Sequence, residues 1–249
     1  MTELTTLTKD GPIATLTLRR PEVRNALSVD LLNDLHARVT SLGASSNVSV
    51  LVLTGEGRAF CAGMDLKAVV DDADAALRLL RSLADLTLSL RALPMVTVAR
   101  VNGAAIGGGC GLACVCDIAI THADSRMGFP EVDLGVCPAV VAPWLVKKIG
   151  AGRARRVLLS GGLMSGAEAH ALGIVDHLAP DAAGLDALCT SLTTRLATGG
   201  HLALLATKEL LNRLDHSIDT PVLHAGAELS AAIVASDETR AILRARLKG

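Results

Sequence analysis

The chain has 249 residues, with 24 basic and 25 acidic side chains and a formal net charge of -1. A chain of this length can bury the core of one large domain. The near-zero charge argues against a nucleic-acid surface, because neutralising phosphates requires a basic excess. Aromatic residues make up only 1% of the chain, which leaves almost no surface for stacking bases. We therefore expect no nucleic-acid partner.

The sequence also bears on compartment and on metal binding. The N-terminus lacks a basic stretch followed by an apolar one, and no run reaches the ~18 apolar residues of a membrane span. We expect a cytoplasmic protein without a membrane partner. Six cysteines in a chain of this size indicate reduced thiols rather than a disulfide framework. Cys114 and Cys116 lack the second pair and the nearby histidines of a zinc site, so no metal is expected.

Strands and helices alternate in the first part of the chain. Residues 13–18 alternate apolar side chains with threonine and predict a strand, and Ser28 is predicted to cap a helix. Residues 48–53 and 96–101 are nearly all apolar, as in buried strands. Leucines at helical spacing fill the interval between them up to Pro94. The order predicts an α/β fold.

Two glycine-flanked segments follow two of these strands. The predicted loop 58–66 places Gly63 just before a helix start, and the run 106–111 opens a short helix ahead of a strand at 115–121. Glycines let backbone N–H groups approach a ligand without a Cβ in the way, and the helix dipole adds partial positive charge. These segments predict a pocket that stabilises an anion.

Glu131 is the candidate for proton chemistry in that pocket. It follows the glycine run on a predicted loop, where its carboxyl group could act as a general acid–base, although a solvated loop carboxylate remains an alternative. A dinucleotide site is disfavoured, because Leu112 stands where the third glycine of Gly-x-Gly-x-x-Gly belongs and the crossover helix is too short. A phosphate loop is excluded because no Lys-Ser/Thr pair follows.

After Pro138 the predicted elements are helices. They cover residues 140–149, 153–160, 165–172, 182–197, 202–214 and 222–233. The last of them carry more apolar surface than a monomer tolerates, so we expect them to pack on another subunit. We place a boundary near residue 180, between a core that holds the site (1–180) and a helical oligomerisation region (181–249).

The motifs along the chain resemble those of the crotonase (enoyl-CoA hydratase/isomerase) superfamily. The matching segments are Arg20–Leu27, Gly57–Leu66, Val101–Cys110, Cys116–Ile118 and Phe129–Gly135. The resemblance implies a crotonase-like ββα superhelix with a C-terminal helical trimerisation region, assembled as a homotrimer or a dimer of trimers. It implies an acyl-CoA thioester substrate and an enolate-like intermediate, with coenzyme A entering as part of the substrate and no separate cofactor.

The resemblance also assigns roles to residues. The backbone N–H groups of Met64 and Gly108 would bind the thioester oxygen, and Glu131 would move the proton. Residues that would hold the coenzyme A moiety are Arg24, near the phosphates with Lys67 assisting, and Ala62, Met64, Asp65 and Leu66. For Asp65, an N-cap role in a helix beginning near Leu66 is an equal alternative.

One departure from the family pattern concerns the reaction type. Two-glutamate hydratases carry glutamate where this chain has Gly111, so only Glu131 remains. The segment 134–143 is similar to a bacterial branch of methylglutaconyl-CoA-type hydratases, some with glycine at this position. The resemblance therefore favours hydration of a 2-enoyl-CoA. A single-glutamate Δ3,Δ2-enoyl-CoA isomerase, an acyl-CoA decarboxylase and a non-catalytic acyl-CoA binder stay open.

Overall fold

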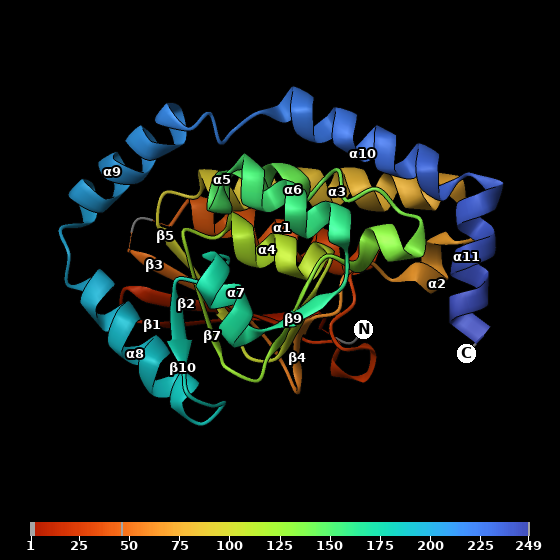
Figure 1. The fold of residues 1–249 in the computed structure, drawn as a ribbon. Coiled ribbons are helices and arrows are strands. Elements are labelled where there is room, and N and C mark those ends of the chain that lie inside the picture. Colours follow the sequence, from red (N-terminus) through yellow and green to blue (C-terminus); the bar gives the residue numbers. More distant parts are fainter. Residues whose placement is uncertain (1–2, 46, 249) are drawn as a thin grey trace.

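The computed structural model describes residues 3–45 and 47–248. Two β-sheets form its centre, and helices pack above them and at both sides (Figure 1). The larger sheet has the strand order β1-β2-β3-β5-β7-β10. Its strands are β1 (Thr5–Asp10), β2 (Ile13–Leu18), β3 (Val50–Gly55), β5 (Val96–Val101), β7 (Ile118–His122) and β10 (His177–Ala179). The pair β1 and β2 is antiparallel, and all other neighbours in this sheet are parallel.

The smaller sheet has the order β4-β6-β8-β9 and alternates with the larger one along the chain. Its strands are β4 (Ala59–Cys61), β6 (Ala104–Ile106), β8 (Arg126–Gly128) and β9 (Leu163–Ser165). The successive units β3-β4-α3, β5-β6-α4 and β7-β8-α5 each place one strand in either sheet and then a helix, namely α3 (Ala73–Ala92), α4 (Gly108–Val115) and α5 (Ala142–Ile149). This repeat is the predicted ββα superhelix.

Local sequence signals explain several of these elements. Helix α1 (Val29–Gly43) begins where predicted, and the Ser28 hydroxyl accepts a hydrogen bond from the Leu31 N–H at 3.3 Å. The prediction of a loop throughout 58–66 was wrong, because β4 lies within it. Strand β6 was also missed, since a strand of three residues is too short to show a period of two.

A second apolar cluster covers the outer face of the larger sheet. Leu185 and Cys189 of α8 (Gly184–Ala197) are buried in it together with strand residues such as Val98 and Ile120. Residues on both sides of position 180 therefore share this cluster, and the division at 180 stays a prediction. The shorter helices α6 (Ala151–Ser160) and α7 (Gly166–Leu172) precede α8.

The last three helices extend around the core (Figure 1): α9 (His201–Leu214), α10 (Thr220–Val234) and α11 (Asp237–Lys248). Helix α10 lies along α3, where His224 contacts Asp85 at 2.6 Å and Glu228 pairs with Arg81. The one buried side chain of α9 is Lys208, whose ammonium group donates to the Met95 carbonyl oxygen at 2.8 Å.

Two further properties concern the whole described chain. Within residues 3–45 and 47–248, no helix is both long enough and apolar enough to cross a bilayer. All six cysteines carry free thiols, and five of them are buried.

Candidate active site

The site forms where the segment after β4 meets the glycine turn between β6 and α4. Gly63 has a φ of +86°, and a Cβ there would lie 2.6 Å from the Ile106 carbonyl oxygen. The same Cβ would lie 3.6 Å from the Gly108 backbone nitrogen. Position 63 therefore requires glycine, because both its dihedral angle and its close contact with the glycine turn exclude a side chain.

Two backbone N–H groups at this junction are available to a ligand. The Leu27 N–H donates to the Gly63 carbonyl oxygen at 2.7 Å, and the Asp65 N–H donates to the Leu27 oxygen at 2.9 Å. These two hydrogen bonds pair Leu27 with the residues on either side of Met64. The Met64 N–H itself has no acceptor in the part of the chain that the structure describes. Gly108 is the first residue of α4, where an N–H has no intrahelical acceptor.

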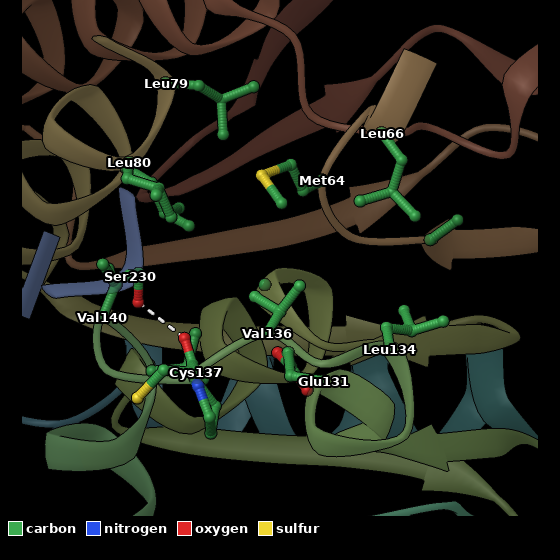
Figure 2. A pocket seen from close by; sticks show the side chains of 15 residues that line it. Met64, Leu66, Leu79, Leu80, Glu131, Leu134, Val136, Cys137, Val140 and Ser230 are labelled. Atoms are coloured by element: carbon green, nitrogen blue, oxygen red, sulfur yellow. Dashed lines mark hydrogen bonds between the residues drawn. The ribbon is translucent and has the colours of Figure 1, made fainter. Parts of the chain in front are cut away.

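Met64 and Gly108 border one cavity of about 90 Å³. Figure 2 shows Leu79, Leu80 and Met64 on one side of it and Glu131 and Val136 on the other. The lining residues are Ala62, Met64, Leu66, Leu79, Leu80, Leu83, Gly108, Glu131, Leu134, Val136, Cys137, Pro138, Val140, Val141 and Ser230. The cavity is thus mostly aliphatic, with one carboxyl group.

Glu131 lies on the short 3₁₀ helix η2 (Pro130–Leu134), which the Val136 N–H closes by donating to the Glu131 carbonyl oxygen at 2.8 Å. The carboxyl oxygen Oε2 is buried and has no hydrogen-bond partner among the described residues. Burial raises the pKa of Glu131 to about 7, against the opposing effect of its own backbone N–H. A carboxyl group with this pKa can both accept and donate a proton near neutrality.

Among the residues that the structure describes, no second carboxyl group lines the cavity. Gly111 lies on α4, and a Cβ there would be 2.9 Å from the Val141 Cβ and closer still to its Cγ1. Val141 itself lines the cavity. The wall at the position that the resemblance gives to a second glutamate is therefore hydrocarbon.

The other predicted binding residues fall into two groups. Ala62 and Leu66 line the cavity, whereas Asp65 and Arg24 do not. Asp65 does stand at the N-cap position of α2 (Leu66–Val69), but its side chain makes no capping hydrogen bond. It pairs instead with Arg20 at 3.3 Å. The interpretation of the Asp65 side chain as a helix cap was therefore wrong.

Arg24 is connected to the cavity by a backbone hydrogen bond to the lining residue Ala62. Its carbonyl oxygen accepts the Ala62 N–H at 3.0 Å, and its side chain is exposed. Lys67, on the first turn of α2, is exposed as well. These two cations thus flank segment 62–66 from the solvent side, and their contact with coenzyme A phosphates stays a prediction.

Ser230 is a lining residue that sequence reasoning missed. It comes from α10, where its hydroxyl group donates to the Cys137 carbonyl oxygen at 2.6 Å and accepts the Ala139 N–H at 3.3 Å. Figure 2 shows the first of these hydrogen bonds. No local sequence pattern indicates that a serine on an apolar helix will line a cavity formed by distant segments of the chain. The leucines of α3 did carry a signal, their helical spacing, but it indicated only a buried face.

A ββα spiral with a carboxyl group and two free backbone N–H groups around one apolar cavity defines the crotonase class of protein. The family model for enoyl-CoA hydratase/isomerase matches residues 8–246, and the chain belongs to this family. The predicted superfamily and fold are thereby confirmed.

Individual relatives agree with that membership. The chain is 34% identical over 199 residues to 2,3-dehydroadipyl-CoA hydratase of Escherichia coli, covering 80% of this chain and 77% of that protein. An enoyl-CoA hydratase structure from Mycobacterium avium matches with a TM-score of 0.89 and 31% identity, over 100% of this chain and 97% of the other. An enoyl-CoA hydratase/isomerase structure from Mycobacterium paratuberculosis has a TM-score of 0.89 and 26% identity, over 98% and 99% of the two chains.

Proposed function

We propose that the chain catalyses reversible hydration of a 2-enoyl-CoA thioester, with Glu131 as its acid–base group. The observation that carries this proposal is the buried, unpartnered Oε2 of Glu131 in the cavity that Met64 and Gly108 also line. A pKa of about 7 suits a group that must take a proton and return it. The names of the relatives, several of them hydratases, support the same reaction type.

The proposed reaction uses the chain's own groups in two steps. The N–H groups of Met64 and Gly108 donate to the thioester oxygen, while the Glu131 carboxylate holds a water molecule and accepts one of its protons. The water oxygen bonds to the β-carbon, and the electron pair of the double bond moves toward the thioester oxygen to form an enolate. Glu131 then gives the proton to the α-carbon, which restores the carboxylate and completes the addition of water.

Enolate stabilisation depends on the two N–H groups. Loss of one such preorganised donor typically costs on the order of 3 kcal/mol of transition-state stabilisation. Gly63 and the glycine turn bring these donors together, because the absence of a side chain at Gly63 lets its backbone pack closely against Ile106. The aliphatic walls exclude water from the rest of the cavity and strengthen both hydrogen bonds.

Isomerisation of a 3-enoyl-CoA is the second candidate, and one observation favours it. Val141 occupies the space beside Gly111, and among the described residues only Glu131 brings a carboxyl group to the cavity. A second carboxylate that could help to orient the water molecule is therefore missing. A single carboxyl group can take a proton from the α-carbon and return it to the γ-carbon without any water. In this reaction a dienolate forms, with its negative charge on the same thioester oxygen, and Glu131 alone carries the proton.

Absorbance of the conjugated thioester distinguishes these reactions. We expect loss of the signal from crotonyl-CoA with formation of 3-hydroxybutyryl-CoA, and a loss slower by roughly 10² to 10⁴ with the Glu131→Gln variant. Gain of conjugation from a 3-enoyl-CoA, without hydration of crotonyl-CoA, would establish the isomerase instead. Tight binding of the acyl-CoA without turnover of either substrate would contradict both and identify a non-catalytic acyl-CoA binder.

We also propose that the chain assembles as a homotrimer or a dimer of trimers through its last helices. Helix α9 buries only Lys208 within one chain, and four of its leucines are exposed. These are Leu202, Leu210, Leu211 and Leu214. Exposed apolar surface of this extent is typical of a subunit interface.

A further inference from the structure

Among the described residues, the wall of the cavity away from Glu131 carries no charge. It is built from Leu79, Leu80 and Leu83 of α3 and from Val140 and Val141 of the loop that follows η2. Within the described chain, the only lining side chains that ionise are those of Glu131 and Cys137, and burial raises the pKa of both. No lysine, arginine or histidine of the described residues reaches this surface.

The polar group of Ser230 is already used. A serine hydroxyl has one proton to donate, and that proton goes to the Cys137 carbonyl oxygen at 2.6 Å. The same oxygen atom accepts the Ala139 N–H at 3.3 Å. Ser230 therefore holds the loop over the cavity, and its hydroxyl group has no further donor for a substrate.

The nearest cations along α3 are bound elsewhere. Arg78 and Arg81 flank Leu79 and Leu80 in sequence, but their side chains are 60% and 41% exposed. Arg78 pairs with Asp72 at 3.5 Å, and Arg81 pairs with Glu228 of α10. Both guanidinium groups thus lie on the outer side of α3 with carboxylate partners.

We propose that this site accepts acyl groups with an uncharged aliphatic end and rejects those that carry a second carboxylate. A carboxylate at the far end of the acyl group would lose its hydration without gaining a cation, and the two free N–H groups, those of Met64 and Gly108, are used by the thioester oxygen, which disfavours it strongly. Ionised Glu131 would repel it as well. The inference rests on the proposed function only in placing an acyl-CoA in this cavity. It gives this chain a different acyl specificity from that of the relative named for 2,3-dehydroadipyl-CoA, whose acyl group carries a second carboxylate.

Binding of two saturated thioesters of equal length tests the proposal without any turnover. Pentanoyl-CoA and glutaryl-CoA share the coenzyme A moiety and five acyl carbons, and differ in a terminal methyl group against a carboxylate. We expect pentanoyl-CoA to bind the wild-type protein about tenfold or more tightly by titration calorimetry. A smaller ratio, or tighter binding of glutaryl-CoA, would overturn the proposal.

A cation placed in the wall provides a second measurement. Leu80→Lys should raise the affinity for glutaryl-CoA relative to pentanoyl-CoA by about tenfold, whereas Leu80→Gln, which is polar but uncharged, should not. An unchanged ratio in folded Leu80→Lys would contradict the inference, and the wild-type comparison decides it if this variant does not fold. If the proposed hydration is wrong, 2-pentenoyl-CoA will not be turned over. The ratio of the binding constants for pentanoyl-CoA and glutaryl-CoA can still be measured in that case, so the two proposals fail separately.

Discussion

The carboxyl group of Glu131 occupies the space that a side chain at Gly107 would need. A Cβ at Gly107 would lie 2.8 Å from Oε1, and the backbone there has a φ of +53°. The Gly107 N–H donates to the Gly128 carbonyl oxygen of β8 at 2.8 Å, so strand pairing fixes the turn beneath the carboxyl group. The glycine at this position thus sets where the acid–base group sits in the cavity.

Gly107→Ala should lower turnover by roughly 10²-fold, because a displacement of the acid–base group by about 1 Å has an effect of this size. Gly11→Ala is the matched control: its φ is +54°, and a Cβ there meets nothing within 4 Å. Both variants should lose stability, on the order of 1–3 kcal/mol, because a positive φ is unfavourable for alanine. Wild-type turnover in a folded Gly107→Ala protein would show that Glu131 does not depend on this space.

Glu131→Gln should lower turnover by roughly 10² to 10⁴ while acyl-CoA binding persists, because the amide keeps the size of the side chain but cannot accept the proton. In the wild type, kcat/KM for crotonyl-CoA should rise with pH through about 7, since the carboxylate is the form that takes the proton from water. Stopped assays from about pH 5.5 to about pH 8.5, roughly 1.5 units either side of that value, measure the profile. A profile without this rise would rule out Glu131 as the base.

Ionisation of Glu131 should lower the free energy of unfolding over the same pH range in which it raises kcat/KM. The folded-state pKa of Glu131 is raised from 4.5 to about 7. Its contribution to stability is therefore complete below pH 4.5 and is lost as the pH rises through 7. The loss amounts to on the order of 3 kcal/mol. Urea denaturation of the wild type and Glu131→Gln across this range should show the loss only in the wild type. Parallel curves would place the Glu131 carboxyl group in water.

Long periodic segments and the motifs made most of this architecture predictable from sequence. The strand at 96–101 matches β5 residue for residue, and Ser28 caps α1, because each rests on local spacing or a local hydrogen bond. The short strands β4 and β6 depend on pairing with each other, which no local pattern contains. Helix α11 was not predicted, although its sequence holds local signals of a helix start: the Ser236 hydroxyl accepts the Thr239 N–H at 3.3 Å, and Asp237 and Glu238 stand in the first turn.

The candidate site shows the same division. Met64, Gly108 and Glu131 stand in motifs that the resemblance marks, and the fold brings them to one cavity. Ser230 and Val141 reach the cavity only through tertiary packing. The sequence around each of them therefore did not indicate that it would line the site. Arg24 is joined to the site by a backbone hydrogen bond that depends on its φ of +55°.

The trimer proposal predicts that substitutions of exposed leucines on α9 dissociate the protein. Leu210 and Leu214 are 55% and 68% exposed in the single chain, so charges there should cost little within it. Sedimentation should show a trimer or hexamer at micromolar concentration for the wild type and a monomer for Leu210→Glu/Leu214→Glu. Leu159→Glu on α6, at a position that is 71% exposed, is the control and should keep the assembly. A monomeric wild type would end the proposal.

The last prediction concerns Gly111 and Val141. Gly111→Glu alone should destabilise the protein by about 1–3 kcal/mol and lower activity, because its Cβ would overlap the Val141 side chain. Val141→Gly removes that side chain, so Gly111→Glu/Val141→Gly should recover stability, with a coupling free energy of roughly 0.5–3 kcal/mol.

The activity of the double variant then separates the two candidate reactions. If the site hydrates 2-enoyl-CoA, the added carboxylate should help to orient water, and Gly111→Glu/Val141→Gly should hydrate crotonyl-CoA faster than Val141→Gly, its matched control. A neighbouring carboxylate also raises the pKa of one member of the pair, so the pH optimum should move upward. If the double variant instead loses isomerisation of a 3-enoyl-CoA and gains no hydration, the cavity serves a proton shuttle with one carboxyl group, and the hydratase proposal is wrong.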